Sequence, residues 1–174
     1  MLLKTLRFVS LLCAALAFGL TLTHDLEIPG KQMLSAADWV KVQNTFYGGF
    51  ALVGGVAEIL GLISAGILLF WLARRPSAFV LTLIAALSFA GMLAVFAFGN
   101  NPINQQVMTW TPATIPTDWQ QIRDAWDRFH AISSGLAALA LTTLLIATLR
   151  ETPSSLATPH GSALEKGHKP SSPG

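Results

Sequence analysis

The sequence predicts an all-α membrane protein, a four-helix transmembrane bundle with two long connectors on its outer side. The 174-residue chain is 52% hydrophobic and only 11% charged, with a mean hydropathy of +0.55, whereas soluble globular domains carry roughly 25% charged residues. Its apolar residues gather into four long runs without the alternation that barrel strands show. Because a lipid-exposed segment must satisfy its own backbone hydrogen bonds, we expect these runs to be helices.

The first apolar run, residues 8–22, is the shortest of the four. Lys4 and Arg7 precede it, and their long side chains can extend to the membrane surface, which gives the segment spanning length. The same start resembles a secretory signal peptide. However, its small-x-small triplets lie inside the apolar run instead of in a polar stretch after it. We therefore predict a retained first span.

The other three runs are residues 46–72, 78–98 and 131–149, each close to the roughly 20 residues that a helix needs to cross a bilayer. Residues 1–150 thus form one transmembrane domain. Residues 151–174 are rich in Ser, Pro and Gly and cannot bury enough apolar surface to offset the entropy of ordering, so we predict a disordered cytoplasmic tail.

The connector 100–130 holds three tryptophans, three prolines and a terminal histidine, which is more than a link between two spans requires. Since Pro102 disfavours helix at Asn101, one interpretation is that the third helix ends there. Asp118 is expected to cap a short amphipathic helix that leads into the fourth span. Its apolar stripe would comprise Trp119, Ile122, Trp126 and Phe129, with Arg123, Asp124, Asp127 and Arg128 on wetter faces.

The basic residues indicate the orientation of the chain. Those that flank the predicted spans on one side are Lys4, Arg7, Arg74, Arg75 and Arg150, whereas the two long connectors mix acidic and basic residues. The positive-inside rule then places both termini and the short middle loop in the cytoplasm. We expect a multi-pass protein of the cell membrane, the inner membrane in a bacterium, whose first partner is the lipid bilayer.

Two function classes are excluded by the composition. Cys13 is the single cysteine, so no intramolecular disulfide can form and electron transfer through a thiol pair is ruled out. The net charge of +2 and the lack of a basic patch beyond Arg74 and Arg75 give no footprint for nucleic acid.

Counting helical rise brings several polar side chains to one depth. His24, Glu58 and His130 each lie about 24 to 30 Å from the basic residue at the other end of their helix, at 1.5 Å per residue. The hydrocarbon core is about 30 Å thick, so all three are expected at its outer edge. The same layer contains Glu27, Asn100 and Asn104.

The facing of Glu58 follows from its neighbours. A 4-3-4-3-4 spacing puts one set of residues on a single helix face: Tyr47, Ala51, Gly54, Glu58, Gly61 and Ala65. Small residues of this kind are found where membrane helices pack closely, so Glu58 is predicted to point into the bundle. An acid inside a span suggests function, although a hydrogen-bonded packing role is the alternative.

The arrangement resembles the anthrone-oxygenase-like family, small four-span membrane proteins that are mostly bacterial. The resemblance covers roughly residues 1–149 and is most specific over 101–130. It rests on HDLEIPGK at 24–31, then Trp39, Gln43 and Tyr47, then Glu58, NPIN at 101–104, Trp110-Thr-Pro, Pro116-x-Asp118-Trp119, Arg123-x-x-Trp126 and His130.

This resemblance implies oxidation of an anthrone to an anthraquinone with molecular oxygen and no known cofactor, on an apolar aromatic small molecule. An anthrone has an acidic C–H, so the protein needs a base, donors for the developing oxyanion and a dry pocket. The expected catalytic residues are Glu58, His24 and His130, with either histidine as the base. The expected substrate-binding residues are Asn104, Tyr47, Trp110 and Glu27.

Three alternatives stay open at this point. His24, Glu27, Glu58 and His130 would make a two-histidine carboxylate set that suits iron, although no local metal motif supports it. A haem held by two histidines between the first and fourth spans is a second possibility. The third is a protein without catalysis, which binds a lipid or small molecule or serves as an accessory subunit of a membrane complex.

Overall fold

The computed structural model describes residues 1–151, and over this range it confirms the all-α membrane fold. No strand occurs within these residues. Four helical stretches are long and apolar enough to cross a membrane, at Leu2–Lys31, Gly48–Leu72, Pro76–Val107 and Trp119–Arg150. The first comprises α1 (Leu2–Leu26) and α2 (Ile28–Lys31), and the second is α4 (Gly48–Leu72). The third comprises α5 (Pro76–Val95), the π-helical turn η1 (Phe96–Asn100) and α6 (Asn101–Val107), and the fourth is α7 (Trp119–Arg150).

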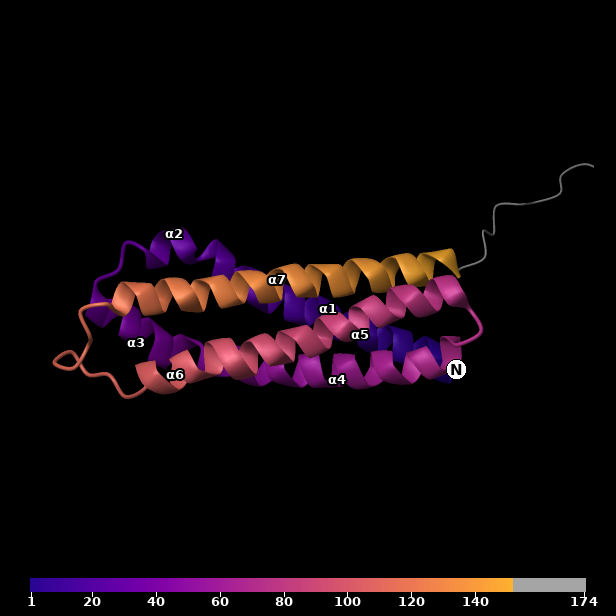
Figure 1. Ribbon diagram of the computed structural model, residues 1–174, viewed down its shortest axis with the longest axis horizontal. Helices are drawn as coiled ribbons and strands as arrows, with labels where there is room; N and C mark the ends of the chain where they lie inside the picture. Colours follow the sequence, from indigo (N-terminus) through magenta and orange to yellow (C-terminus); the bar gives the residue numbers. More distant parts are fainter. Residues whose placement is uncertain (152–174) are drawn as a thin grey trace, which may run out of the picture.

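The four long helices pack in a ring (Figure 1). α1 packs against α4 and α7, and α5 packs against the same two helices from the other side. Small residues let the backbones approach, and Ala14, Ala85, Ala137 and Ala140 are all fully buried in the core between them. The segment that resembles a signal peptide is thus one of the four packed helices.

Gly61 shows why the predicted small-residue face is needed. A Cβ atom at Gly61 would lie 2.3 Å from Cε1 of the Phe89 ring, which is itself fully buried. Ala65 on the same face is also fully buried, and Glu58 is only 8% exposed. The prediction that Glu58 points into the bundle is confirmed.

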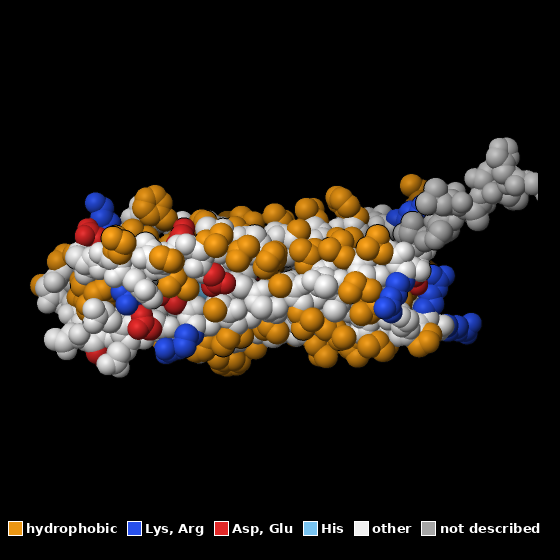
Figure 2. Space-filling model, turned by 90° about the horizontal axis from the view of Figure 1, so that it is seen from above, with side chains coloured by type: hydrophobic (Ala, Val, Ile, Leu, Met, Phe, Trp, Pro, Cys, Tyr) orange, Lys and Arg blue, Asp and Glu red, His pale blue; other side chains and the backbone are white. Residues whose placement is uncertain are grey.

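The two ends of the bundle differ in charge (Figure 2). Lys and Arg side chains predominate at one end, called here the basic end, whereas acidic and basic side chains are mixed towards the other, and hydrophobic side chains cover much of the surface between them. At the basic end Glu151 pairs with Arg7 and, at 3.1 Å, with Arg75. Glu151 was predicted to belong to the tail, but these ion pairs tie it to the bundle. The rest of the predicted tail, 152–174, lies outside the described residues.

The opposite end, called here the connector end, carries both long connectors. The first contains α2 and α3 (Ala36–Phe46), whose N-terminus is capped by the Ser35 hydroxyl, an acceptor for the Asp38 N–H. The second connector begins as a helix, because the third spanning helix does not end at Asn101 as one interpretation of the sequence had it. The Asn101 N–H bonds to the Phe96 carbonyl five residues back, and α6 continues from there with Pro102 in its first turn.

α7 contains the predicted amphipathic segment as its first three turns, continuous with the fourth span. Asp118 occupies the N-cap position, but its side chain accepts no capping hydrogen bond. The placement of Arg123 and Asp127 on wet faces was wrong: they are 8% and 6% exposed. Burial is possible because Arg123 lies over the Trp119 ring and Lys31 of α2 lies near Asp127.

Candidate functional site

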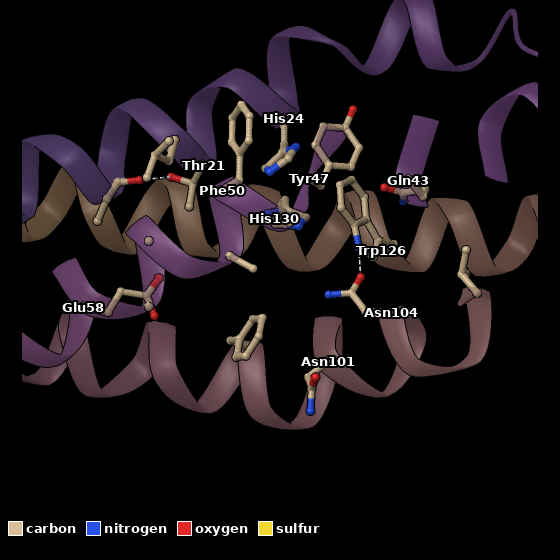
Figure 3. A pocket seen from close by; sticks show the side chains of 18 of the residues that line it. Thr21, His24, Gln43, Tyr47, Phe50, Glu58, Asn101, Asn104, Trp126 and His130 are labelled. Carbon is tan, nitrogen blue, oxygen red and sulfur yellow. Dashed lines mark hydrogen bonds between the residues drawn. The ribbon is translucent and has the colours of Figure 1, made fainter. Parts of the chain in front are cut away.

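A cavity of about 580 Å³ lies inside the connector half of the bundle. This is within the range of about 300–1,000 Å³ typical of small-molecule sites. Its walls are mostly aromatic and small aliphatic residues, contributed by α1, α3, α4, the η1–α6 segment and α7. Figure 3 shows His24, Tyr47 and Phe50 on one side, Asn101 and Asn104 opposite, and His130 and Trp126 between them. An apolar chamber with a few polar groups favours a mainly apolar ligand.

Two histidines from the first and fourth spans meet in this cavity. The rings of His24 and His130 lie with their centroids 4.2 Å apart, and Trp126 is 4.1 Å from His130. Nδ1 of both histidines is buried without a hydrogen-bond partner among the described residues. Nε2 is therefore the nitrogen through which each ring can reach a ligand.

A charged network lies behind the wall made by Tyr47 and Trp126. The Tyr47 hydroxyl donates to Oε2 of Glu27 at 2.7 Å, and the same oxygen lies 3.7 Å from Nδ1 of His24. Burial, and then the nearby Glu27, raise the pKa of the Tyr47 hydroxyl, so it remains a donor. Lys31 lies 3.4 Å from Glu27 and 3.9 Å from Asp127, and its ammonium donates to the His24 carbonyl at 3.2 Å.

The π-helical turn aims an amide at the cavity. Trp126 Nε1 donates to Oδ1 of Asn104 at 2.8 Å, and Asn100 Nδ2 donates to the Trp126 carbonyl at 3.1 Å. Because its oxygen is held by Trp126, Asn104 turns its NH₂ group away from the indole and into the cavity (Figure 3). The result is a fixed donor opposite the histidines.

Glu58 lies at the end of the cavity that is nearer the basic end, apart from the two histidines (Figure 3). It was predicted to pair with a histidine or Asn104, but it makes no hydrogen bond or ion pair within residues 1–151. A buried carboxyl without a protein partner is costly, and a bound ligand can supply the missing contact.

The sequence matches the family model described as anthrone oxygenase over residues 42–143, more than half of the chain. The chain belongs to the anthrone oxygenase family. No curated protein and no solved structure matches it. The matched range contains Glu58, Asn104 and His130, whereas His24, Glu27 and Lys31 precede it.

In this anthrone oxygenase family member, five of the seven predicted site residues line this cavity: His24, Tyr47, Glu58, Asn104 and His130. Their chemical roles stay a prediction. Glu27 does not line the cavity but contacts two residues that do, Tyr47 and His24. Trp110 lies outside it as well, in an aromatic cluster with Trp39 and Trp119 that packs α3 against Val107 of α6.

The iron and haem alternatives fit this geometry poorly. Within residues 1–151 no group of three or more His, Cys, Asp or Glu side chains could hold a metal ion. The set predicted for iron is divided because Glu58 lies apart from the histidines. A haem needs its plane between two axial ligands, whereas the rings of His24 and His130 are themselves in contact.

Sequence reasoning missed Lys31, Asp127 and Trp126 as parts of the site. Lys31 is only 4% exposed, and its ammonium lies 4.6 Å from the Trp126 ring. The signal in the sequence was weak, because it consists of one lysine in the first connector and one aspartate, next to Trp126, in the second. The residue pairs lie almost a hundred positions apart, so local spacing could not connect them.

Proposed function

We propose that this protein uses molecular oxygen to oxidise an apolar, anthrone-like aromatic molecule, without a resident cofactor. The observation that carries the proposal is the opposition of two groups across an apolar cavity. On one side stands His24, backed by Glu27, and on the other stands the Asn104 amide, fixed by Trp126. A base facing an oxyanion donor is what removal of a proton next to a carbonyl requires.

His24 is proposed as the general base. The activated C–H bond of the substrate breaks, its electron pair stays on carbon, and the proton goes to Nε2 of His24. Glu27 lies 3.7 Å from Nδ1, so its carboxylate stabilises the imidazolium that forms. His130, in ring contact with His24, restricts the tilt of the imidazole and contributes to the wall on which an aromatic ligand can stack.

The Asn104 amide is proposed as the oxyanion donor. The negative charge left on carbon delocalises through the ring system to the carbonyl oxygen opposite, and the Asn104 NH₂ donates to that oxygen. Preorganised donors of this kind typically lower the activation free energy by about 2.7–4 kcal/mol. The Trp126–Asn104 hydrogen bond, at 2.8 Å, holds the amide in place before substrate arrives.

Oxygen then completes the reaction without another co-reactant. The carbanion reduces O₂ and forms a C–O bond, and the resulting peroxide takes the proton back from His24. Loss of the second hydrogen of the same carbon, with cleavage of the O–O bond, leaves a ketone and releases water. One CH₂ group and one O₂ thus give one C=O and one H₂O. Glu58, unpaired at the far end of the cavity, is proposed to bind a polar substituent of the ring system.

The test is oxygen consumption by the purified protein in lipid nanodiscs with anthrone as substrate, measured against spontaneous oxidation in empty nanodiscs. One oxygen atom from ¹⁸O₂ should appear in the anthraquinone formed. His24→Asn should reduce the rate to near the spontaneous background, whereas the neighbouring Thr23→Val, which does not line the cavity, should not.

Two results would count against the proposal. Equal rates for wild type and His24→Asn would remove His24 as the base. Binding of anthrone by the wild-type protein with no oxygen uptake above background would instead support the alternative function, a membrane protein that binds a small molecule without catalysis.

A further inference from the structure

We propose that the cavity is entered sideways from the bilayer, through an opening between α4 and the η1–α6 segment. Its ligand would therefore be a molecule dissolved in the membrane. The opening is defined by Gly48, Ala51 and Gly55 on α4 and by Phe96 and Met108 on the other rim, all of which line the cavity. The proposal rests on the proposed function only in using the same cavity, and it holds for any ligand that binds there.

The cavity-lining residues that are exposed on α4 form a row along the helix. Gly48 and Ala51 line the cavity and are exposed, and Gly55 is half-buried. These three recur at a 3-4 spacing and therefore form one stripe on α4. From Gly48 to Gly55 the stripe advances by seven residues, which is about 10 Å along the helix axis. An opening at the end of the bundle would expose only the last residues of each helix, so the stripe indicates a slot in the side.

The connector end of the cavity is covered by protein. α3 packs against α6 there, with Trp39 fully buried and Val107 2% exposed between them. Trp110 and Trp119 pack against the same cluster. A ligand arriving along the bundle axis from that side would have to separate these tryptophans.

The outer surface beside the slot is largely apolar, although Asn44 and Asn101 also line the cavity. On α4, Leu52 is 70% exposed and Val53 and Val56 are nearly half exposed, and on the other rim Phe98 is 85% exposed. Large apolar side chains that point outward from spanning helices face lipid. The slot therefore opens on lipid near the outer edge of the hydrocarbon core, where an apolar aromatic molecule can enter it, instead of on bulk water.

The glycines at the slot have no packing reason to be glycine. A Cβ atom at Gly48 or Gly55 would meet nothing within 4 Å, in contrast to Gly61, where it would collide with Phe89. Gly66 gives a matched control, because it lies on the same helix, is also free of neighbours within 4 Å and does not line the cavity. A leucine at Gly55 would narrow the slot, and at Gly66 it would only face lipid.

The experiment measures binding of anthraquinone, supplied within nanodisc bilayers, from the quenching of tryptophan fluorescence, since Trp126 lines the cavity. In Gly55→Leu the association rate should fall by about tenfold or more, which corresponds to about 1.36 kcal/mol added to the barrier. Gly66→Leu should bind as the wild type does. Leucine is a better helix former than glycine, so neither variant is expected to lose helix stability.

A second comparison identifies the phase from which the ligand comes. Anthraquinone with a long alkyl chain should still bind, because the chain can remain in lipid while the rings pass through the slot. An anthraquinone sulfonate kept in water should associate slowly. Three results would each overturn the proposal. The first is an unchanged association rate in Gly55→Leu, and the second is fast binding of the sulfonate together with exclusion of the alkylated ligand. The third is that the wild-type protein binds no anthraquinone. Binding without oxygen uptake would overturn only the proposed function.

Discussion

Replacement of Lys31 by methionine provides the sharpest test of the charged network behind the cavity. Methionine keeps the length and most of the apolar stem of lysine, so contact with the Trp126 ring is largely retained. The ammonium is lost, and with it the counter-charge for Asp127, whose carboxylate oxygens are both buried without a hydrogen-bond partner among residues 1–151.

The expected cost can be worked from the burial of the two partners. Lys31 is 4% exposed and Asp127 6% exposed, so removal of one partner leaves an uncompensated buried charge, which costs about 3–5 kcal/mol. Glu27 contributes less, because 38% of its side chain is exposed and water can replace the lysine. We therefore expect the free energy of unfolding of Lys31→Met to fall by about 3–5 kcal/mol.

The assay is equilibrium unfolding in mixed micelles, compared among Lys31→Met, Asp127→Asn and the double variant. Removing both charges takes away the unpaired carboxylate, so the double variant should recover most of the stability lost in Lys31→Met. Additive losses in the double variant would refute the reasoning, since they would mean that Lys31 and Asp127 do not stabilise one another. A loss below about 1 kcal/mol in Lys31→Met, the size of an exposed ion pair, would refute the burial argument as well.

Four further predictions follow from the same geometry. Tyr47 is the single tyrosine of the chain, and burial and Glu27 raise its pKa, so tyrosinate absorbance should titrate above the usual value of about 10 in the folded protein and at about 10 after denaturation. Stability contributed by this shift is present below pH 10 and is lost as the pH rises further, and Tyr47→Phe should show a flatter decline there. Glu58→Gln should preserve folding and reduce ligand binding or turnover, whereas Asp118→Asn, at an exposed position, should leave both unchanged; equal behaviour of the two would argue for a packing role of Glu58. Gly61→Ala should lower stability by about 1–3 kcal/mol because the new methyl group overlaps the Phe89 ring, while Gly66→Ala should not, as thermal unfolding can show. Reporter fusions after Arg75 and Arg150 should read cytoplasmic and one near Thr114 outside, and an outside signal at Arg150 would reverse the predicted topology.

The spans and the contact between the two histidines could be predicted, because both depend on the length of apolar runs and on the rise of a helix per residue. Helical rise per residue places His24 and His130 at one depth, and their rings are in contact. The small-residue spacing around Glu58 predicts its inward direction, and it is buried. The depth count assumed that Arg7, Arg74 and Arg150 lie at one level, which is why the displacement of Glu58 from the histidines towards the basic end (Figure 3) was not foreseen.

Other parts of the site depend on contacts between distant segments and escaped prediction. The burial of Lys31 and Asp127 needs α2 folded against α7, and amphipathic spacing alone assigned Asp127 to a wet face. The local rule for Pro102 favoured a helix end at Asn101, whereas one π-helical turn allows the helix to continue to Val107. Trp110 followed the family motif but belongs to the cluster that covers the connector end.

The π-helical turn at Phe96–Asn100 divides the third long helix into a part that packs in the bundle core and a part that lines the cavity. An extra residue in one turn rotates everything beyond it by about 100°, one residue's share of a 3.6-residue turn. On the basic-end side of the turn, Phe89 and Met92 fill the bundle core, while Asn100, the last residue of the turn, and Asn104 beyond it hold Trp126. Deletion of one residue in this turn would convert it to regular α-helix and let only one of these two faces keep its alignment. The direction of the side chains that pack in the core and the direction of the cavity amides are thus set independently. Substitutions that change the cavity therefore do not have to change the packing of the bundle.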